Sequence, residues 1–202
     1  MDERLKKQLD FALEIDKEKN IFRQTHLSGH GRNENDAEHA WHMAIMAYLL
    51  KEYSNEPVDI GKVMLMCLIH DIVEIDAGDT YAYDENAKKT QHEREKKAAD
   101  RIYGLLPGEQ GRKLYDLWEE FEAQETPEAK FARTMDNIQP MLLNDASGGI
   151  SWKEHNVKLS QILGRNERTH LGSETIWKYA YNNILKKHIQ KGNIIDDVNE
   201  NL

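Results

Sequence analysis

Several classes of protein are excluded by what this chain of 202 residues lacks. Its single cysteine, Cys67, permits neither an internal disulfide framework nor a cysteine-rich zinc site. No apolar stretch is long enough to span a bilayer, and the segment from Met1 to Leu5 lacks the pattern of a signal peptide. We therefore expect a cytoplasmic protein without membrane contact, in which Cys67 is a small buried apolar residue.

Positive charge is also scarce. The sequence has 36 acidic and 27 basic side chains, which give a formal net charge of −9. A nucleic-acid polymer is therefore an unfavourable partner, because neutralising its phosphates needs a basic protein surface. A small anionic substrate is still compatible with this composition, since a metal ion and one or two arginines can reverse the local potential.

Alternating strand patterns are nearly absent, whereas apolar residues recur at helical spacing along most of the chain. Capping residues predict where several helices begin, namely the capping box of Asn35 with Glu38, Thr126 before Pro127, and Ser173. We predict an all-α helical bundle, with helices over 3–19, from 36, over 58–73 and 87–105, from 107, from 127, near 154–163 and after 173.

Other features of this bundle are less regular. We expect residues 23–35 to form a loop, because two glycines lie there among scattered polar residues. We also expect Pro140 to kink or end its helix.

Two helices are expected to turn apolar stripes inward. These stripes are Leu5, Leu9 and Leu13 in the first helix and Trp41, Ala44, Ile45, Tyr48 and Leu49 in the second. With no repeat or low-complexity linker, we predict a single domain of residues 1–202.

A polar cluster follows the apolar run from Val63 to Ile69. It contains one histidine and four carboxylates: His70, Asp71, Glu74, Asp76 and Asp79. Burying the run carries this cluster toward the interior, where charged groups are rarely placed unless they are paired or bind a metal. His39 in the preceding helix and Asp136 on a buried stripe of a later helix are further candidates. We interpret His39, His70, Asp71 and Asp136 as candidate metal ligands.

Three motifs together resemble those of the HD-domain metal-dependent phosphohydrolases, with the 5'-deoxynucleotidase branch the nearest. They are Glu38-His39, the run from His70 to Glu74 followed by Gly78-Asp79, and Met135-Asp136. The resemblance covers residues 22–144, and the C-terminal helices over 154–190 are less diagnostic. It implies a homodimeric helical bundle with His39, His70, Asp71 and Asp136 around a divalent cation. Two imidazoles and two carboxylates suit Mn²⁺, Co²⁺, Mg²⁺ or Fe²⁺, and Zn²⁺ is also compatible.

The resemblance also implies roles for three further residues. Glu74 would orient or deprotonate the attacking water, and Asp79 would contact the sugar or the leaving oxygen. Arg23 would clamp the phosphate, for which a planar guanidinium is well suited. The family's tryptophan after this arginine is replaced by Gln24, so selectivity for 2'-deoxyribose is left open.

The predicted activity is hydrolysis of a nucleoside 5'-monophosphate, preferably a deoxyribonucleotide, by a metal-dependent phosphomonoesterase. Two alternatives stay open. The same ligands would serve a phosphodiesterase or pyrophosphohydrolase of a signalling nucleotide, and a nucleotide-sensing HD module would keep the fold without turnover. Simpler interpretations also exist for single residues: His70 and Asp71 could be a structural pair at a helix end, and Arg23 could simply pair with nearby acids.

Overall fold

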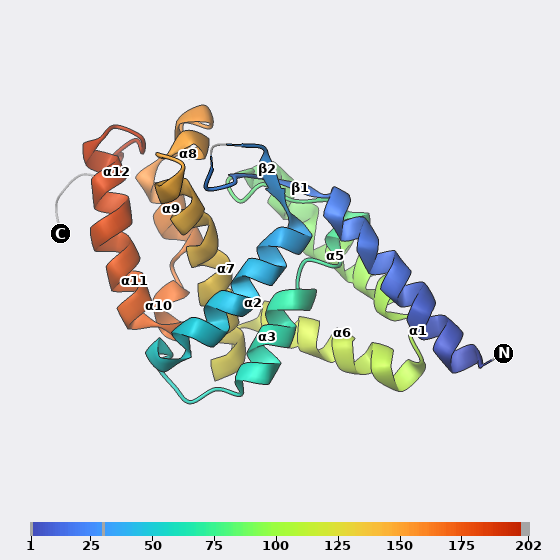
Figure 1. Cartoon of the computed structure of the whole chain (residues 1–202). Coiled ribbons are helices and arrows are strands. Elements are labelled where there is room, and N and C mark those ends of the chain that lie inside the picture. The colour runs from blue at the N-terminus through green and yellow to red at the C-terminus, as the bar shows by residue number, and fades with distance from the viewer. Residues whose placement is uncertain (1, 30, 199–202) are drawn as a thin grey trace.

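Helices form nearly all the regular structure of the computed structural model, which describes residues 2–29 and 31–198 (Figure 1). The first half contains α1 (Glu3–Glu14), a 3₁₀ segment (Ile15–Asn20), β1 (Phe22–His26), β2 (Asn33–Asn35), α2 (Asp36–Leu50), a 3₁₀ turn (Lys51–Tyr53), α3 (Ile60–Ile69), α4 (Glu74–Ala77) and α5 (Glu85–Tyr103). The second half contains α6 (Gly108–Ala123), α7 (Pro127–Ala146), α8 (Ile150–Glu154), α9 (Leu159–Arg165), α10 (Thr169–Gly172), α11 (Glu174–Ala180), a π-helical segment (Tyr181–Leu185) and α12 (Lys186–Gln190). The predicted all-α fold is confirmed. Within the described residues, no helix is long and apolar enough to cross a membrane.

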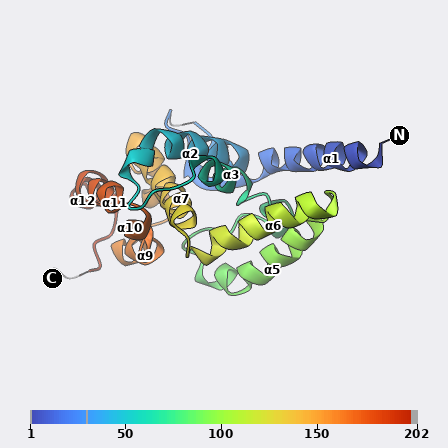
Figure 2. The same cartoon turned by 90° about the horizontal axis from the view of Figure 1, so that it is seen from below.

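The helix α7 lies at the centre of the fold. It contacts α2, α3 and α6 as well as α10 and α11, and both views show it between these two groups (Figures 1 and 2). As predicted, Thr126 caps it, with its hydroxyl accepting from the amide of Ala129 at 3.3 Å. The expectation that Pro140 could end the helix is wrong, because α7 continues to Ala146. Since proline has no N–H, the carbonyl of Asp136 receives no helical hydrogen bond from residue 140.

Residues 23–35 contain an antiparallel hairpin of β1 and β2 and are therefore not the predicted loop. Phe22 pairs with Asn35, and His26 pairs with Asn33. The strands are short and polar, so no alternation of apolar residues marks them in the sequence. Tertiary contacts secure the hairpin instead, for example the Ser151 hydroxyl that donates to the carbonyl of Gln24 at 2.9 Å.

The central apolar helix is shorter than the predicted 58–73. It begins after Asp59, whose carboxylate accepts from the amide of Gly61 at 2.9 Å, and it ends at Ile69. Residues 70–73 form a turn in which the amide of Glu74 donates to the carbonyl of Asp71 at 2.8 Å, and α4 follows. The helix predicted near 154–163 is likewise divided, into α8 and α9.

The apolar stripes predicted to face inward on the first two helices are largely exposed. In α1 only Phe11 is buried, because the helix lies at the edge of the molecule beside the end of α6 and is covered on little of its surface (Figure 2). In α2 the buried residues include Met43, Ala44, Met46 and Ala47, whereas Trp41, Ile45, Tyr48 and Leu49 are exposed. Apolar residues surround α2 on all sides, so their spacing does not indicate which side packs on the core.

Gly172 sets the close packing of α10 on α7. A Cβ at this position would lie 2.3 Å from the carbonyl oxygen of Lys130 and 2.4 Å from the hydroxyl of Thr134. We expect Gly172→Ala to lower the free energy of unfolding by about 1–3 kcal/mol, the usual cost of overpacking, in urea denaturation followed by circular dichroism. The matched control is Gly164→Ala in α9, where a Cβ would meet no described atom within 4 Å apart from its chain neighbours and the backbone of its own helix, and where alanine favours the helix. Equal stability of the two variants would contradict this account of the contact.

Candidate metal centre

The four residues predicted as metal ligands converge from three separate parts of the chain. His39 lies in α2, His70 and Asp71 lie in the turn after α3, and Asp136 lies in α7. His39 Nε2 is 3.2 Å from Asp136 Oδ1, and His70 Nε2 is 3.0 Å from Asp71 Oδ2. The cross distances are 3.9 Å from His70 Nε2 to Asp136 Oδ1 and 4.0 Å from His39 Nε2 to Asp71 Oδ2. One small ion could therefore contact all four side chains.

Hydrogen bonds orient both imidazoles toward this point. His39 Nδ1 donates to Gln139 Oε1 at 2.9 Å, and His70 Nδ1 donates to the carbonyl of Cys67 at 2.9 Å. The Gln139 amide is held in turn, because its nitrogen donates to Glu34 Oε2 at 2.8 Å and lies 3.1 Å from Nδ1 of His42. Such outer contacts select the tautomer that leaves Nε2 free to bind a metal.

The donor set fits a divalent cation. With both Nδ1 atoms donating, a ring in its neutral form turns an Nε2 lone pair toward the carboxylates of Asp71 and Asp136. These groups repel one another unless a proton or a cation lies between them. His70 Nε2 is buried, and although Asp71 Oδ2 lies 3.0 Å away, the angle is not that of a hydrogen bond to any described residue. Two imidazole nitrogens and two carboxylate oxygens match the ligands of Mn²⁺, Co²⁺, Fe²⁺ and Zn²⁺.

Burial and charge shift the pKa values of the two histidines in opposite directions. Burial lowers the pKa of His39 to about 4, so this ring is neutral at pH 7. Burial also acts to lower the pKa of His70, but the carboxylate of Asp71 outweighs it and raises the pKa to about 9. In this arrangement a proton on His70 takes the place that a cation would fill.

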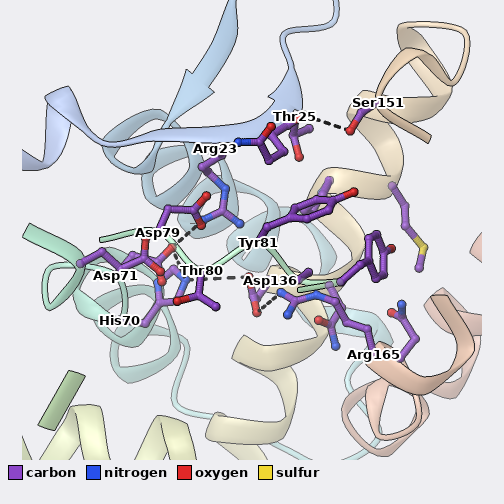
Figure 3. Close-up of a pocket in the computed structure, with 18 of the residues that line it drawn as sticks. Arg23, Thr25, His70, Asp71, Asp79, Thr80, Tyr81, Asp136, Ser151 and Arg165 are labelled. Carbon is purple, nitrogen blue, oxygen red and sulfur yellow. Dashed lines mark hydrogen bonds and ion pairs between the residues drawn. The ribbon is translucent and has the colours of Figure 1, made fainter. Parts of the chain in front are cut away.

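The remaining predicted residues line a pocket that opens onto this centre (Figure 3). Arg23, Glu74 and Asp79 line it together with His70, Asp71 and Asp136. Gly78 has φ +73°, which is unfavourable for other residues, and this turn places Asp79 at the pocket. Glu74 is 6% exposed, and its Oε2 has no partner within the described part of the chain.

Negative charge exceeds positive charge around Arg23. Its Nη1 atom lies 2.9 Å from Asp71 Oδ2 and 3.3 Å from Asp36 Oδ1, and its Nε lies 3.6 Å from Glu34 Oε1. Burial and the charges of Asp71 and Asp36 raise the pKa of Glu74 well above its usual range. Burial, followed by the charge of Asp71, raises the pKa of Asp36 to about 7. A site with so many buried acids needs more cationic charge than one arginine provides.

The sequence interpretation missed several residues of this site. Glu34 and Asp36 are buried just before His39, and one oxygen each of Asp36, Asp71 and Glu74 lie within 4.8 Å of one another, so this group could hold a second cation. Both acids stand beside a capping box, where acids are ordinary, so their pattern does not indicate a site. Gln139 is one turn after Asp136 on the same face of α7, a spacing that could have identified it.

Two arginines contact Asp136 on the side of its carboxylate that faces away from the histidines. Its Oδ2 accepts from Arg133 at 3.0 Å and from Arg165 at 3.2 Å. Burial alone would raise the pKa of Asp136, but the charges of Arg165 and Arg133 hold it well below the usual range. Arg133 also stacks on Phe121, 4.2 Å from the ring centre, and pairs with Glu122 at 2.7 Å. Asp136 is therefore kept ionised, with Oδ1 directed toward the two histidines.

A helical fold in which a His, a His-Asp pair and a distant Asp meet in one pocket defines a protein of the HD type. The family model described as HD domain matches residues 15–177, and the chain belongs to this family. Membership of the family implies a divalent metal, and the His/Asp cluster described above fits one.

The chain is also similar to individual proteins. It is 34% identical over 111 residues to 5'-deoxynucleotidase HDDC2 of Homo sapiens, a match of 55% of this chain and 53% of that protein. The chain thus spans about half the length of the curated relatives it matches. A crystal structure described as a predicted metal-dependent phosphohydrolase from Magnetospirillum magnetotacticum is 46% identical, with a TM-score of 0.90 over 95% of this chain and 96% of that one. A conserved hypothetical protein from Pyrococcus furiosus, 20% identical with a TM-score of 0.58 over 86% of this chain and 99% of that one, shares the fold.

Proposed function

We propose that this chain is a divalent-metal-dependent phosphohydrolase that releases phosphate from nucleoside 5'-monophosphates, preferably deoxyribonucleotides. The observation that carries the proposal is the meeting of His39, His70, Asp71 and Asp136 beside a pocket lined by Glu74 and Arg23. The names of the curated relatives, 5'-deoxynucleotidases, support the substrate class. We propose Mn²⁺, Co²⁺, Mg²⁺ or Fe²⁺ as the cation, with Zn²⁺ also compatible.

Each proposed role follows from a position in the pocket. His39, His70, Asp71 and Asp136 would hold the cation, which when bound acts as a Lewis acid toward water and the phosphoryl oxygens. The charge of a bound cation would favour the ionised form of Glu74, which would orient the attacking water and accept its proton as the new P–O bond forms. Arg23 would donate to the phosphate oxygens, and Asp79 would position the sugar while the bond to the 5'-oxygen breaks and this oxygen takes up a proton from water to leave as the nucleoside hydroxyl.

A substrate screen tests the proposal. Purified protein would be incubated with Mn²⁺, Co²⁺ or Mg²⁺ and with ribo- and deoxyribonucleoside monophosphates, triphosphates and cyclic dinucleotides, and released phosphate or nucleotide product would be measured. Release of phosphate from the monophosphates alone is the expected result. Cleavage of only triphosphates or cyclic dinucleotides would instead identify a pyrophosphohydrolase or phosphodiesterase. Nucleotide binding in calorimetry without turnover under any metal would identify a sensing module.

We also propose that residues 1–202 form a single HD-type domain and that the chain is a homodimer. One continuous apolar core that runs from Phe11 to Ile194 supports the single domain. The exposed stripe of α2, formed by Trp41, Ile45, Tyr48 and Leu49, supports the dimer. Spacings of four, seven and eight residues place it on one helix face, and apolar faces of this kind are typical of protein interfaces. A two-fold axis would place the same stripe of each copy against the other.

Replacing Trp41 with glutamate tests the dimer. We expect Trp41→Glu to raise the dimer dissociation constant by about 30-fold or more, because a central interface aromatic typically contributes about 2 kcal/mol or more. Light scattering coupled to size exclusion, over a range of protein concentrations, measures the change. The control is Tyr179→Glu in α11, where an aromatic residue is 60% exposed, close to the 61% of Trp41. A wild-type protein that stays monomeric at high concentration would contradict the proposal.

A further inference from the structure

Arg165 reaches the pocket from outside the motif-bearing part of the chain. It is the last residue of α9, its Nη2 atom donates to Asp136 Oδ2 at 3.2 Å, and it lines the pocket. Figure 3 shows it approaching Asp136 from the side opposite His70. Its side chain is 27% exposed, whereas that of Arg23 is 12% exposed. Part of the Arg165 side chain is therefore exposed at a position that lines the pocket.

The three arginines that line the pocket differ in how far acids neutralise them. Arg133 lies against two carboxylates, those of Glu122 and Asp136. Arg23 lies against three carboxylates, those of Glu34, Asp36 and Asp71. Among the described residues, Arg165 pairs with one carboxylate, that of Asp136, and it shares that group with Arg133. Asp136 also directs its other oxygen toward the histidines, so less of its charge is available to the arginines. Arg165 is therefore a less compensated cation than Arg23.

A phosphate monoester carries close to two negative charges at pH 7. The pocket that would receive it is lined by several acids, among them Asp71, Glu74, Asp79, Glu95 and Glu122. A dianion would be repelled by this lining unless donors with net positive charge face it. Arg165 offers such a donor at the pocket wall, and a guanidinium can bind two phosphate oxygens at once.

We infer that Arg165 is a second phosphate-binding arginine, which with Arg23 holds the phosphate of the substrate next to the metal centre. This inference rests on the proposed function for the identity of the substrate, but it concerns a phosphate-binding property that can be measured separately. A different role for Arg165, in which it only positions Asp136, would act through the metal centre. The two roles therefore change different quantities.

Inorganic phosphate is the probe for the test. Calorimetry on the Mn²⁺-loaded protein would compare wild type with Arg165→Met, which removes the charge at similar side-chain length. We expect the phosphate dissociation constant and the KM for a nucleoside monophosphate to rise about 10- to 100-fold, the usual effect of losing hydrogen bonds to a charged group. Manganese content, measured by elemental analysis, should stay at the wild-type level. Arg165→Lys should recover part of the phosphate affinity, since lysine keeps the positive charge but lacks the planar pair of N–H donors of the guanidinium.

Arg168 provides the matched control. It lies three residues further along the chain, is exposed, and donates to the carbonyl of Gln124 at 3.0 Å. Arg168→Met makes the same change in net charge and should bind phosphate as wild type does. Unchanged phosphate affinity in Arg165→Met, or a loss of manganese that accounts for the loss of affinity, would overturn the inference. If Arg165→Met does not fold, Arg165→Lys decides the question, since wild-type affinity in that variant would also overturn it.

The outcome separates this inference from the proposed function. If the wild-type protein hydrolyses no nucleotide with any metal, the proposed function fails. The comparison of Arg165→Met with Arg168→Met would still decide whether Arg165 binds phosphate. If nucleotides are hydrolysed and phosphate affinity does not depend on Arg165, the function stands and the inference fails.

Discussion

Replacing Asp71 with alanine is expected to abolish both metal binding and phosphate release, while the helical circular-dichroism spectrum is unchanged. Asp71 Oδ2 lies 3.0 Å from His70 Nε2 and 4.0 Å from His39 Nε2, so its loss removes a carboxylate from the centre of the cluster. A Lewis-acidic cation supplies several kcal/mol toward phosphoryl transfer, which predicts a loss on the order of 10³-fold or more. The fold should persist because Arg23 keeps Asp36 and Glu34 as partners.

Asp76→Ala is the matched control for this variant. Asp76 belongs to the same acidic stretch, but it is exposed and pairs with Arg101 at 2.8 Å on the surface. Elemental analysis should find the wild-type metal content in Asp76→Ala and a strongly reduced content in Asp71→Ala. Turnover and metal content retained in Asp71→Ala would remove this residue from the proposed ligand set.

Replacing Glu74 with glutamine is expected to separate metal binding from hydrolysis. The substitution keeps the shape of the side chain and removes the carboxylate that would accept the proton of water. We expect turnover to fall by roughly 10²–10⁴-fold, the usual contribution of an acid–base group, with metal content unchanged. The buried, unpartnered Oε2 of Glu74 in the described structure supports this role, because an unmade hydrogen bond in the interior is costly unless a ligand completes it.

Glu18→Gln is the matched control, because it also replaces a buried carboxyl group with a buried amide. Glu18 and Glu74 are both 6% exposed, and burial raises the pKa of Glu18 to about 8, but Glu18 is not among the residues that line the pocket. Steady-state kinetics should therefore show nearly wild-type turnover for Glu18→Gln. Comparable losses in both variants would mean that the electrostatics of the buried acids, and not proton transfer at Glu74, limits the reaction.

Local signals predicted much of the helical framework. The capping box at Asn35 and Glu38 and the capping side chains of Thr126 and Ser173 all form in the structure, because a cap depends on residues within one turn. Predictions that depended on contacts between distant segments were less accurate. The hairpin of β1 and β2 has no periodic signal, and α2 buries a different face from the one predicted.

The candidate site shows the same difference between features that depend on local sequence and features that depend on contacts between distant segments. The types and order of His39, His70, Asp71 and Asp136 were sufficient to predict a cluster, and the structure brings these four residues together. Their hydrogen-bond partners could not be predicted in the same way. Gln139 contacts His39 across 100 positions of sequence, and that contact exists only because α2 packs on α7.

The sequence by itself determined that the chain is helical, where several helices begin, and which histidines and acids are candidates for a metal, because these properties depend on residue type and spacing within a few turns. Only the tertiary structure decided that residues 70–73 form a turn between α3 and α4, that acids surround Arg23, and that Arg165 reaches Asp136 from α9. These features arise where segments far apart in the chain pack together, and no local pattern of residues specifies such an arrangement.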